Sequence, residues 1–354
     1  MFSQRNKAIY LDSQGNYSVR VITESYIPHG SQSLVKVNYS AINPADVRHY
    51  HMGMSEFVAG YEFVRTVLET GPESPFKVGN DVFGFAFPGD HRPLHVGAHQ
   101  GFLLAEPSFT YKRPKDMDPI TAVTMIVGAM TAIDALFNML GFGLPAAGLG
   151  GKSAANVPIL IWGGSSVALF EIGATQCFEY RSPTVVDDIR TAMTHCSGKL
   201  THVFDAVTTG LGVSESPSEG DKIEASYALS SPALARQCCD PDTPDSELHL
   251  CASLAMPGQS LWKFALVYRT VETMDHGVGL QDWDEELQKL MEDKVRDWGS
   301  RSDRGIRWLI ANHAIYSKPP RTRIVHGAKE GIQAIHDVWN GKISREKVVI
   351  SRPL

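Results

Sequence analysis

One segment of the chain has the pattern of a nucleotide-binding turn. The residues ILIWGGSSVA, from position 159 to 168, lead from an apolar stretch into two glycines and two serines. Glycines after a parallel strand let the backbone approach a pyrophosphate, and the N-terminus of the next helix offers free N–H groups. The turn is not GxGxxG, so it indicates nucleotide binding only in combination with other features.

Five further positions carry chemically useful side chains, each with a simpler interpretation beside the functional one. His49 and His51 would share one face of a strand and could hold a metal, but no third ligand has sensible spacing, and solvated imidazoles are the alternative. Adjacent Cys238 and Cys239 favour a buried reduced pair, because neighbouring cysteines form only a strained disulfide. Asp205, inside the apolar segment VFDAV, is either a hydrogen-bonded core carboxylate or a group facing a cleft at a strand end.

Composition excludes several classes of protein. The 354 residues are 43% hydrophobic, which excludes disorder as the main state. The net charge is −6 and no block of like charge occurs, which disfavours nucleic-acid partners. The apolar stretch 120–140 contains Asp134 and Asn138, and the first residues lack the apolar run of a signal peptide, so no membrane partner is expected. Five cysteines without a CxxC spacing indicate reduced thiols and a cytoplasmic location.

The elements that must position these residues fall into two groups. Up to about residue 110 the chain predicts short strands, at 34–42, 61–69 and 81–87, separated by Gly- and Pro-rich turns, which is typical of a small barrel-like β domain. Asp118 and Pro119 then begin a helix whose apolar residues recur every three or four positions until Gly141.

Strands and helices alternate after this helix. Strands are expected at 157–164, 175–180, 200–207 and 247–254, with helices beginning at Ser182-Pro183 and Ser231-Pro232. This alternation predicts a parallel, doubly wound sheet with helices on both faces. Two more helices are expected at 284–298 and 303–316, followed by the strand TRIVH, a helix at 328–340 and the strand EKVVIS.

Several segments occur together in the order of a known family. They are INPADV, AGYEFVRTV, KVGNDVFGF, GAMTAIDALF, ILIWGGSSV, EIGATQCFEYRSP, HVFDAV and EKVVI. Together they make the chain resemble the medium-chain dehydrogenase/reductase superfamily, in its zinc-free quinone-oxidoreductase-like branch, and most of all the fungal trans-acting enoyl reductases of polyketide biosynthesis.

The resemblance implies an α/β fold with a GroES-like β-barrel domain and a Rossmann-type parallel sheet that is shortened in this chain. The implied domains are 1–118 (GroES-like, catalytic), 119–316 (cofactor domain, truncated near 165–172) and 317–354 (return to the catalytic domain). The resemblance also implies NADPH as cofactor and hydride delivery to an activated C=C bond. No metal is expected, because Asn43 stands where zinc-containing members have a cysteine and Tyr61 where they have a histidine.

Site residues are carried over from the family position by position. Arg48 and Tyr61 are the expected catalytic residues, Arg48 as a cation that stabilises an enolate and Tyr61 as a candidate proton relay or as packing at the former metal position. The implied cofactor contacts are Ala45, Asp46, Val47, Arg48, Ser165, Ser166, Val167, Ala168, Tyr180, Leu254, Ala255, Arg345 and Glu346. The implied substrate contacts are Val127, Gly128, Ala129, Met130, Thr131, Ala132, Ile133 and Asp134.

The chain departs from the family between the glycine turn and EIGATQCFEY. A βαβ unit takes about 30 residues or more, and here the second Rossmann strand and the loop that reads the ribose are expected to be missing. Three explanations compete: a segment is lost from the reported sequence, the cofactor site is crippled in a true variant, or TQCFEY takes the place of the second strand with Glu179 as the ribose-binding acid.

The functional expectation is therefore an NADPH-dependent reductase of secondary metabolism, monomeric or homodimeric, acting on a small-molecule or carrier-bound enoyl polyketide, with a polyketide synthase as candidate partner. The alternatives are a cofactor-impaired relative that acts as a non-redox enzyme or binding scaffold, and a quinone reductase.

Overall fold

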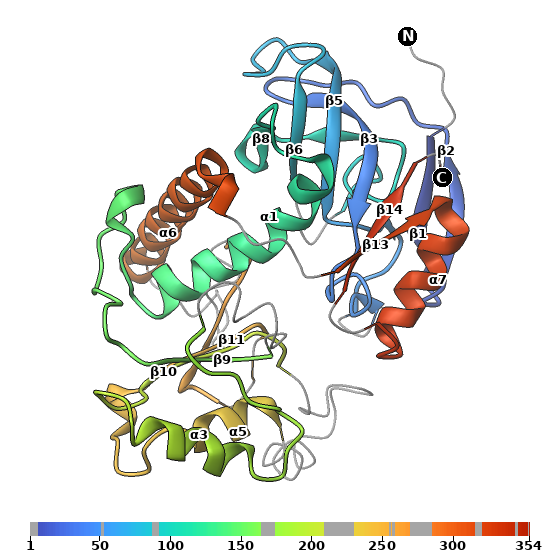
Figure 1. Cartoon of the computed structure of the whole chain (residues 1–354). Helices are drawn as coiled ribbons and strands as arrows, with labels where there is room; N and C mark the ends of the chain where they lie inside the picture. The colour runs from blue at the N-terminus through green and yellow to red at the C-terminus, as the bar shows by residue number, and fades with distance from the viewer. Residues whose placement is uncertain are drawn as a thin grey trace. The chain divides into compact units, whose positions relative to one another are not determined.

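The computed structural model describes most of the chain, drawn in colour in Figure 1. The described residues are 6–50, 53–86, 92–163, 174–208, 230–254, 256, 259–269, 285–315, 321–343, 346–352 and 354. The chain divides into two compact units, the first made of Met1–Val127 and His313–Leu354 and the second of Gly128–Asn312. The domain limits expected from the sequence, 118/119 and 316/317, stay predictions beside this division.

Two sheets, antiparallel except for the pair β13 and β14, build most of the first unit. The smaller has the order β2-β1-β4, and the larger has the order β13-β14-β3-β5-β6-β8 with β7 also paired to β3. Their strands are β1 (Asn6–Leu11), β2 (Tyr17–Ile22), β3 (Ser33–Ala41), β4 (Phe57–Val58), β5 (Glu62–Thr70), β6 (Asp81–Phe85), β7 (Phe102–Ala105), β8 (Thr110–Lys112), β13 (Thr322–His326) and β14 (Lys347–Ser351).

Period-two patterns position the core of this unit. Val35 and Val37 of β3 are buried against Phe63 and Val67 of β5, as the alternation of apolar residues predicts. The predicted strands at 34–42, 61–69 and 81–87 are thereby confirmed as β3, β5 and β6.

A late segment of the chain completes the larger sheet. Strand β14 pairs antiparallel with β3, Val349 opposite Ala41 and Ser351 opposite Tyr39, and parallel with β13. Between β13 and β14 runs α7 (Gly327–Trp339), whose buried Ala334 and Ile335 pack on the same apolar cluster as Ile350. This confirms the expected closing strand–helix–strand segment, and it brings Lys347 to the first unit.

The second unit contains four parallel strands in the order β12-β11-β10-β9. They are β9 (Ile159–Trp162), β10 (His202–Asp205), β11 (His249–Ala252) and β12 (Trp262–Phe264). Helices α3 (Val185–Met193) and α5 (Ser231–Gln237) lie on one side of the sheet (Figure 1). Side chains alternate between the two faces of the sheet. Val203 and Leu250 pack with these helices, whereas Phe204 and Cys251 pack on the other face with the turn after α1. The predicted parallel sheet with helices on both faces is confirmed.

One strand expected in this sheet is not formed. The described residues 174–180 form no strand, and Phe178 packs on the core from a loop while Glu179 and Tyr180 are exposed. The segment TQCFEY is short and half polar, and no neighbouring strand supplies it with backbone partners, so its β-propensity alone does not hold it extended. Within the described residues β9 is therefore the edge of the sheet, and the explanation that places TQCFEY as second strand is wrong.

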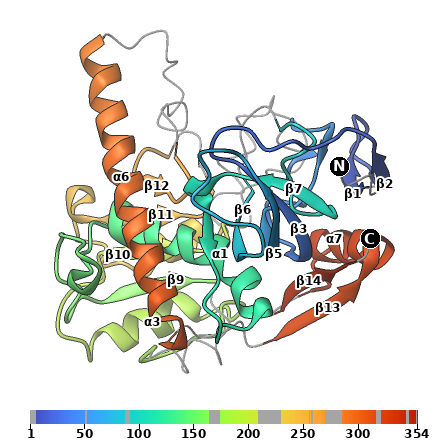
Figure 2. The same cartoon turned by 90° about the horizontal axis from the view of Figure 1, so that it is seen from above.

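The two helices expected at 284–298 and 303–316 form a single helix, α6 (Glu285–Ala311), seen along its length in Figure 2. The expected break lay at Gly299 and Ser300. One glycine costs a helix only about 1 kcal/mol, and the fully buried Ile306 together with Gly305, which fits against Ile133, anchors the C-terminal half. Packing thus overrides the local helix-breaking tendency.

Helix α1 (Pro119–Ile133) begins at the predicted cap, because a carboxylate oxygen of Asp118 accepts the N–H of Thr121 at 3.2 Å. It continues as a π-helical turn, Asp134–Met139, and Gly141 follows with φ +77°. The helix is apolar and long enough to cross a membrane, but 61% of its most apolar window is buried, which is also what the core helix of a globular domain shows.

Inside the second unit the carboxylate of Asp134 is neutralised by Arg269. The Nη2 of Arg269 lies 2.6 Å from Oδ2 of Asp134, both side chains are buried, and the N–H of Leu266 donates to the same oxygen at 2.9 Å. The guanidinium also lies over the ring of Trp298, 5.0 Å from its centroid. The pair joins the turn after α1 to the segment that follows β12.

Breaking this pair should strongly destabilise the second unit. We expect Asp134→Ala to lower the free energy of unfolding by about 3–5 kcal/mol, because it leaves a buried guanidinium unpaired. The double variant Asp134→Leu/Arg269→Met should recover most of the loss. Urea unfolding followed by tryptophan fluorescence measures both.

Asp293→Ala is the matched control, since Asp293 forms an exposed ion pair with Arg296 and should change stability by less than about 1 kcal/mol. A loss in Asp134→Ala no larger than in this control would contradict a stabilising role of the buried pair.

Candidate active site

A buried aspartate fixes the turn that carries several of the expected site residues. Residues 44–49 form a turn after β3, in which Oδ2 of Asp46 accepts the N–H of Asn43 at 2.8 Å and Oδ1 accepts the N–H of Gly60 at 2.9 Å. Complete burial raises the pKa of Asp46 to about 6, against the opposing effects of these N–H groups and of Arg92. The carboxylate therefore ties the turn to the backbone just before Tyr61.

Because the Asp46 side chain is engaged in this way, it faces the protein interior. Ala45 is exposed on the same turn, and Val47 and Arg48 are partly exposed. Of the four cofactor contacts expected here, three thus present side chains at least partly to solvent.

The position of a family zinc ligand is held by a polar cluster of Asn43, Glu62 and Lys347. The fully buried Oε2 of Glu62 lies 2.7 Å from Nζ of Lys347 and accepts the Asn43 amide at 2.8 Å, while Oε1 accepts the N–H of Val127 at 2.8 Å. Lys347 also donates to the amide oxygen of Asn43. The oxygens of Asn43 and Glu62 thus bind an ammonium group, and the described residues contain no set of three His, Cys, Asp or Glu side chains that could hold a metal.

Tyr61 forms a hydrogen bond with His49 inside an aromatic cluster. The Tyr61 hydroxyl is hydrogen-bonded to Nε2 of His49, and the Tyr61 ring stacks on the ring of Phe85 with the two centroids 5.7 Å apart. Burial raises the pKa of Tyr61 above its usual value of 10. Burial and the charge of Arg92 lower the pKa of His49 to about 3, so the imidazole is neutral near pH 7. His51 lies outside the described residues.

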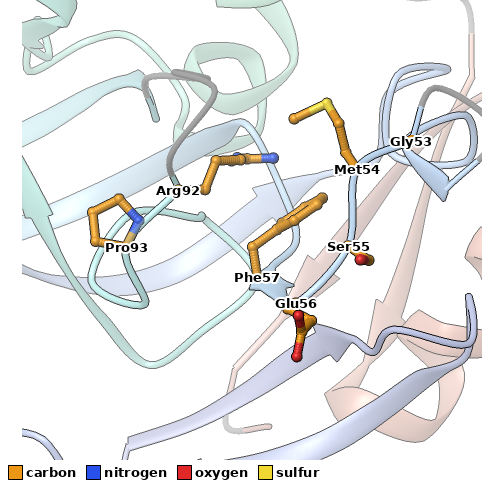
Figure 3. A pocket seen from close by; sticks show the side chains of 7 residues that line it. All are labelled: Gly53, Met54, Ser55, Glu56, Phe57, Arg92 and Pro93. Carbon is orange, nitrogen blue, oxygen red and sulfur yellow. The ribbon is translucent and has the colours of Figure 1, made fainter.

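Arg48 and Arg92 contribute cations to the same unit in different ways. Arg48 is partly exposed, burial lowers the pKa of its guanidinium, and no described carboxylate pairs with it. Arg92, drawn beside Phe57 in Figure 3, is buried. Its guanidinium lies 4.6 Å from the ring centroid of Phe57 and 4.7 Å from that of Tyr61. Sequence reasoning missed Arg92, because it lies in no recognised motif.

In the second unit the described chain reaches the glycine turn only at its start. Gly163 has φ +93°, and a Cβ there would lie 2.5 Å from a methyl carbon of Val207, so only glycine fits. Tyr180 is 47% exposed, Leu254 is partly exposed after β11, and in the first unit Glu346 is partly exposed just before β14. The remaining expected cofactor contacts lie outside the described residues: Ser165, Ser166, Val167, Ala168, Ala255 and Arg345.

Two other groups have internal roles. Asp205 is fully buried and accepts the hydroxyl of Ser231 at 2.6 Å and the N–H of Thr208 at 2.9 Å, which makes it a core carboxylate. Along the expected substrate contacts, the Val127 N–H is bonded to Glu62 and the Asp134 carboxylate to Arg269, while Gly128 is exposed. Substrate contact by 127–134 stays a prediction.

Comparison with known proteins extends this description. Residues 29–103 match the Alcohol dehydrogenase GroES-like domain. A trans-enoyl reductase of Hypocrea jecorina (strain QM6a) is 30% identical over 190 residues, 49% of this chain and 52% of that protein. One of Phaeosphaeria nodorum (strain SN15) is 27% identical over 284 residues, 73% of this chain and 75% of that protein. The first match thus spans about half the length of the relative.

Among solved structures, the CurK enoyl reductase superposes with a TM-score of 0.59 at 14% identity and covers 99% of this chain and 100% of its own. This likeness shows the fold. The predicted resemblance to the medium-chain dehydrogenase/reductase superfamily near the fungal trans-acting enoyl reductases is confirmed, as is the two-domain fold with a GroES-like domain and a parallel sheet.

The buried neutral His49 should make stability depend on pH. A histidine whose pKa is lowered in the folded state contributes stability that is fully present above pH 6.5 and lost as the pH falls toward 3. Between pH 6.5 and 4 the free energy of unfolding of the wild type should fall, and we expect His49→Gln to make this fall smaller by on the order of 3 kcal/mol. Urea unfolding at a series of pH values measures this difference.

His29→Gln is the control, since His29 is exposed on the same unit. An unchanged pH slope in His49→Gln, equal to that of wild type and of the control, would show that His49 is not held neutral by burial.

Proposed function

We propose that the protein is an NADPH-dependent reductase of an activated C=C bond in secondary metabolism. The observation that carries the proposal is the cluster of Asn43, Glu62 and Lys347, which puts an ammonium among the oxygens at the former zinc position in a chain that is similar to trans-enoyl reductases. An alcohol dehydrogenase of this fold with zinc needs sulfur or imidazole ligands there. Reduction of an enone or enoyl thioester needs no such metal.

The residues of the first unit fit this chemistry. A bound nicotinamide supplies hydride. The protein must then stabilise negative charge on the carbonyl oxygen and supply a proton. Arg48, partly exposed and without a described carboxylate partner, is the proposed cation for the enolate. Tyr61 is the proposed proton donor, because a tyrosine hydroxyl is protonated near pH 7 and its hydrogen bond with His49 holds it in place.

The cofactor site is supported in part by the described residues. Gly163 after β9 has φ +93°, a conformation that favours glycine, as glycine-rich phosphate-binding turns do. A second strand with a ribose-binding acid is not among the described residues, where β9 is the sheet edge. We propose NADPH on the resemblance, with cofactor contacts at Ala45, Val47, Arg48, Tyr180, Leu254 and Glu346.

That same sheet edge favours a second candidate, a cofactor-impaired relative that acts as a non-redox enzyme or as a binding scaffold. Both candidates keep the first unit unchanged and differ only in whether a dinucleotide binds. A quinone reductase differs from the main proposal only in substrate.

The remaining proposals follow from the relatives. The substrate is a small-molecule or carrier-bound enoyl polyketide, and a polyketide synthase is the partner. None of the five cysteines, all of which lie in the described residues, forms a disulfide, which supports a cytoplasmic location.

Direct titration with NADPH separates the two candidates. We expect a dissociation constant in the micromolar range, which corresponds to a binding free energy of about −8 kcal/mol. Calorimetry or cofactor fluorescence measures it, and NADH should bind more weakly. No binding up to millimolar NADPH would overturn the reductase proposal for this chain.

Removing the Tyr61 hydroxyl should slow catalysis without weakening cofactor binding. We expect Tyr61→Phe to lower kcat for enone reduction about 100-fold, the usual scale of a lost general acid, with the NADPH dissociation constant unchanged. NADPH oxidation with a conjugated enone as substrate measures the rate.

Tyr26→Phe serves as control because Tyr26 is a partly buried tyrosine of the same unit whose hydroxyl bonds Leu94 and Gln100 instead. If Tyr61→Phe were as active as Tyr26→Phe, Tyr61 would be a packing residue.

A further inference from the structure

Arg92 is a buried cation that forms no salt bridge with a carboxylate among the described residues. It is 7% exposed, and its Nη2 donates a hydrogen bond to the carbonyl oxygen of Gly60 at 3.2 Å. Within the described part of the chain, Nε and Nη1 are buried without a hydrogen-bond partner. Burial of an unpaired guanidinium is costly, and an unsatisfied group of this kind calls for a missing acceptor.

The buried carboxylates described in this unit do not hydrogen-bond to the guanidinium. Asp46 interacts with Arg92 electrostatically, but its oxygens accept the N–H groups of Asn43 and Gly60. Glu62 is paired with Lys347. The guanidinium lies over the rings of Phe57 and Tyr61, which stabilise its charge but do not bind Nε and Nη1.

A cavity of about 510 Å³ adjoins Arg92. It is lined by Gly53, Met54, Ser55, Glu56, Phe57, Arg92 and Pro93. Figure 3 shows the Met54 side chain extending toward the guanidinium and the Glu56 carboxylate pointing away from it. The cavity has the size of a small-ligand site, with a cation and apolar side chains on its wall.

We propose that this cavity binds a monocarboxylate with a short apolar chain, with the carboxylate on Arg92. A planar carboxylate matches the guanidinium fork and can accept two N–H groups at once. Met54 and Phe57 supply apolar contacts for the chain. A carboxylate carries one negative charge, which matches the single positive charge of Arg92. The proposal does not rest on NADPH binding, because every residue it uses belongs to the first unit.

The test compares hexanoate with hexanamide, its neutral analogue, by calorimetric titration of the full chain without NADPH. We expect hexanoate to bind at least about tenfold more tightly, the scale of a charge-assisted hydrogen bond. Arg92→Gln should abolish this preference, and Met54→Trp should weaken binding of both compounds by filling the cavity.

Arg20→Gln is the matched control, because Arg20 also lies over an aromatic ring, that of Tyr10 at 4.6 Å, in the same unit. It should bind hexanoate as wild type does. Equal binding of acid and amide by wild type, no hexanoate binding at millimolar concentration, or a preserved preference in Arg92→Gln would each overturn the proposal. If Arg92→Gln fails to fold by circular dichroism, Met54→Trp decides: undiminished binding there overturns the site.

Discussion

The carboxylate of Glu62 holds together three distant parts of the first unit. It lies at the start of β5 and binds Asn43 after β3, the backbone of Val127 in α1, and Lys347 at the start of β14. A fully buried carboxylate is tolerated only when its charge and its lone pairs are matched. The Lys347 ammonium matches the charge, and the two N–H donors match the remaining lone pairs.

The polar cluster also determines what chemistry the site can support. With an ammonium bound by Asn43 and Glu62, the neighbouring aromatic cluster is left without a metal ligand, since Tyr61 is bonded to His49. In the proposed reductase, Arg48 would supply the positive charge and the Tyr61 hydroxyl the proton.

Local patterns in the sequence predicted most elements of the fold. Strand β3 could be predicted from the alternation of Val35 and Val37, and the start of α1 from the cap at Asp118, because both features depend on residues close together in the sequence. Errors arose where distant packing decides: Ile306 keeps α6 continuous across Gly299, and TQCFEY forms no strand with any described segment.

The same distinction applies to the site. The motifs pointed to Arg48 and Tyr61. The contact of Lys347 with Glu62 and the place of Arg92 over Phe57 depend on segments far apart in sequence, which no local spacing reveals.

The pairing of β14 with β3 has a consequence for biosynthesis. A ribosome completes residues 128–312, the whole second unit, before it makes Lys347. Until then β3 lacks one neighbour and Glu62 lacks its counter-charge, whereas the parallel sheet already has all four of its described strands. The second unit can therefore fold first on the nascent chain, and the first unit, although it begins the sequence, completes its fold last.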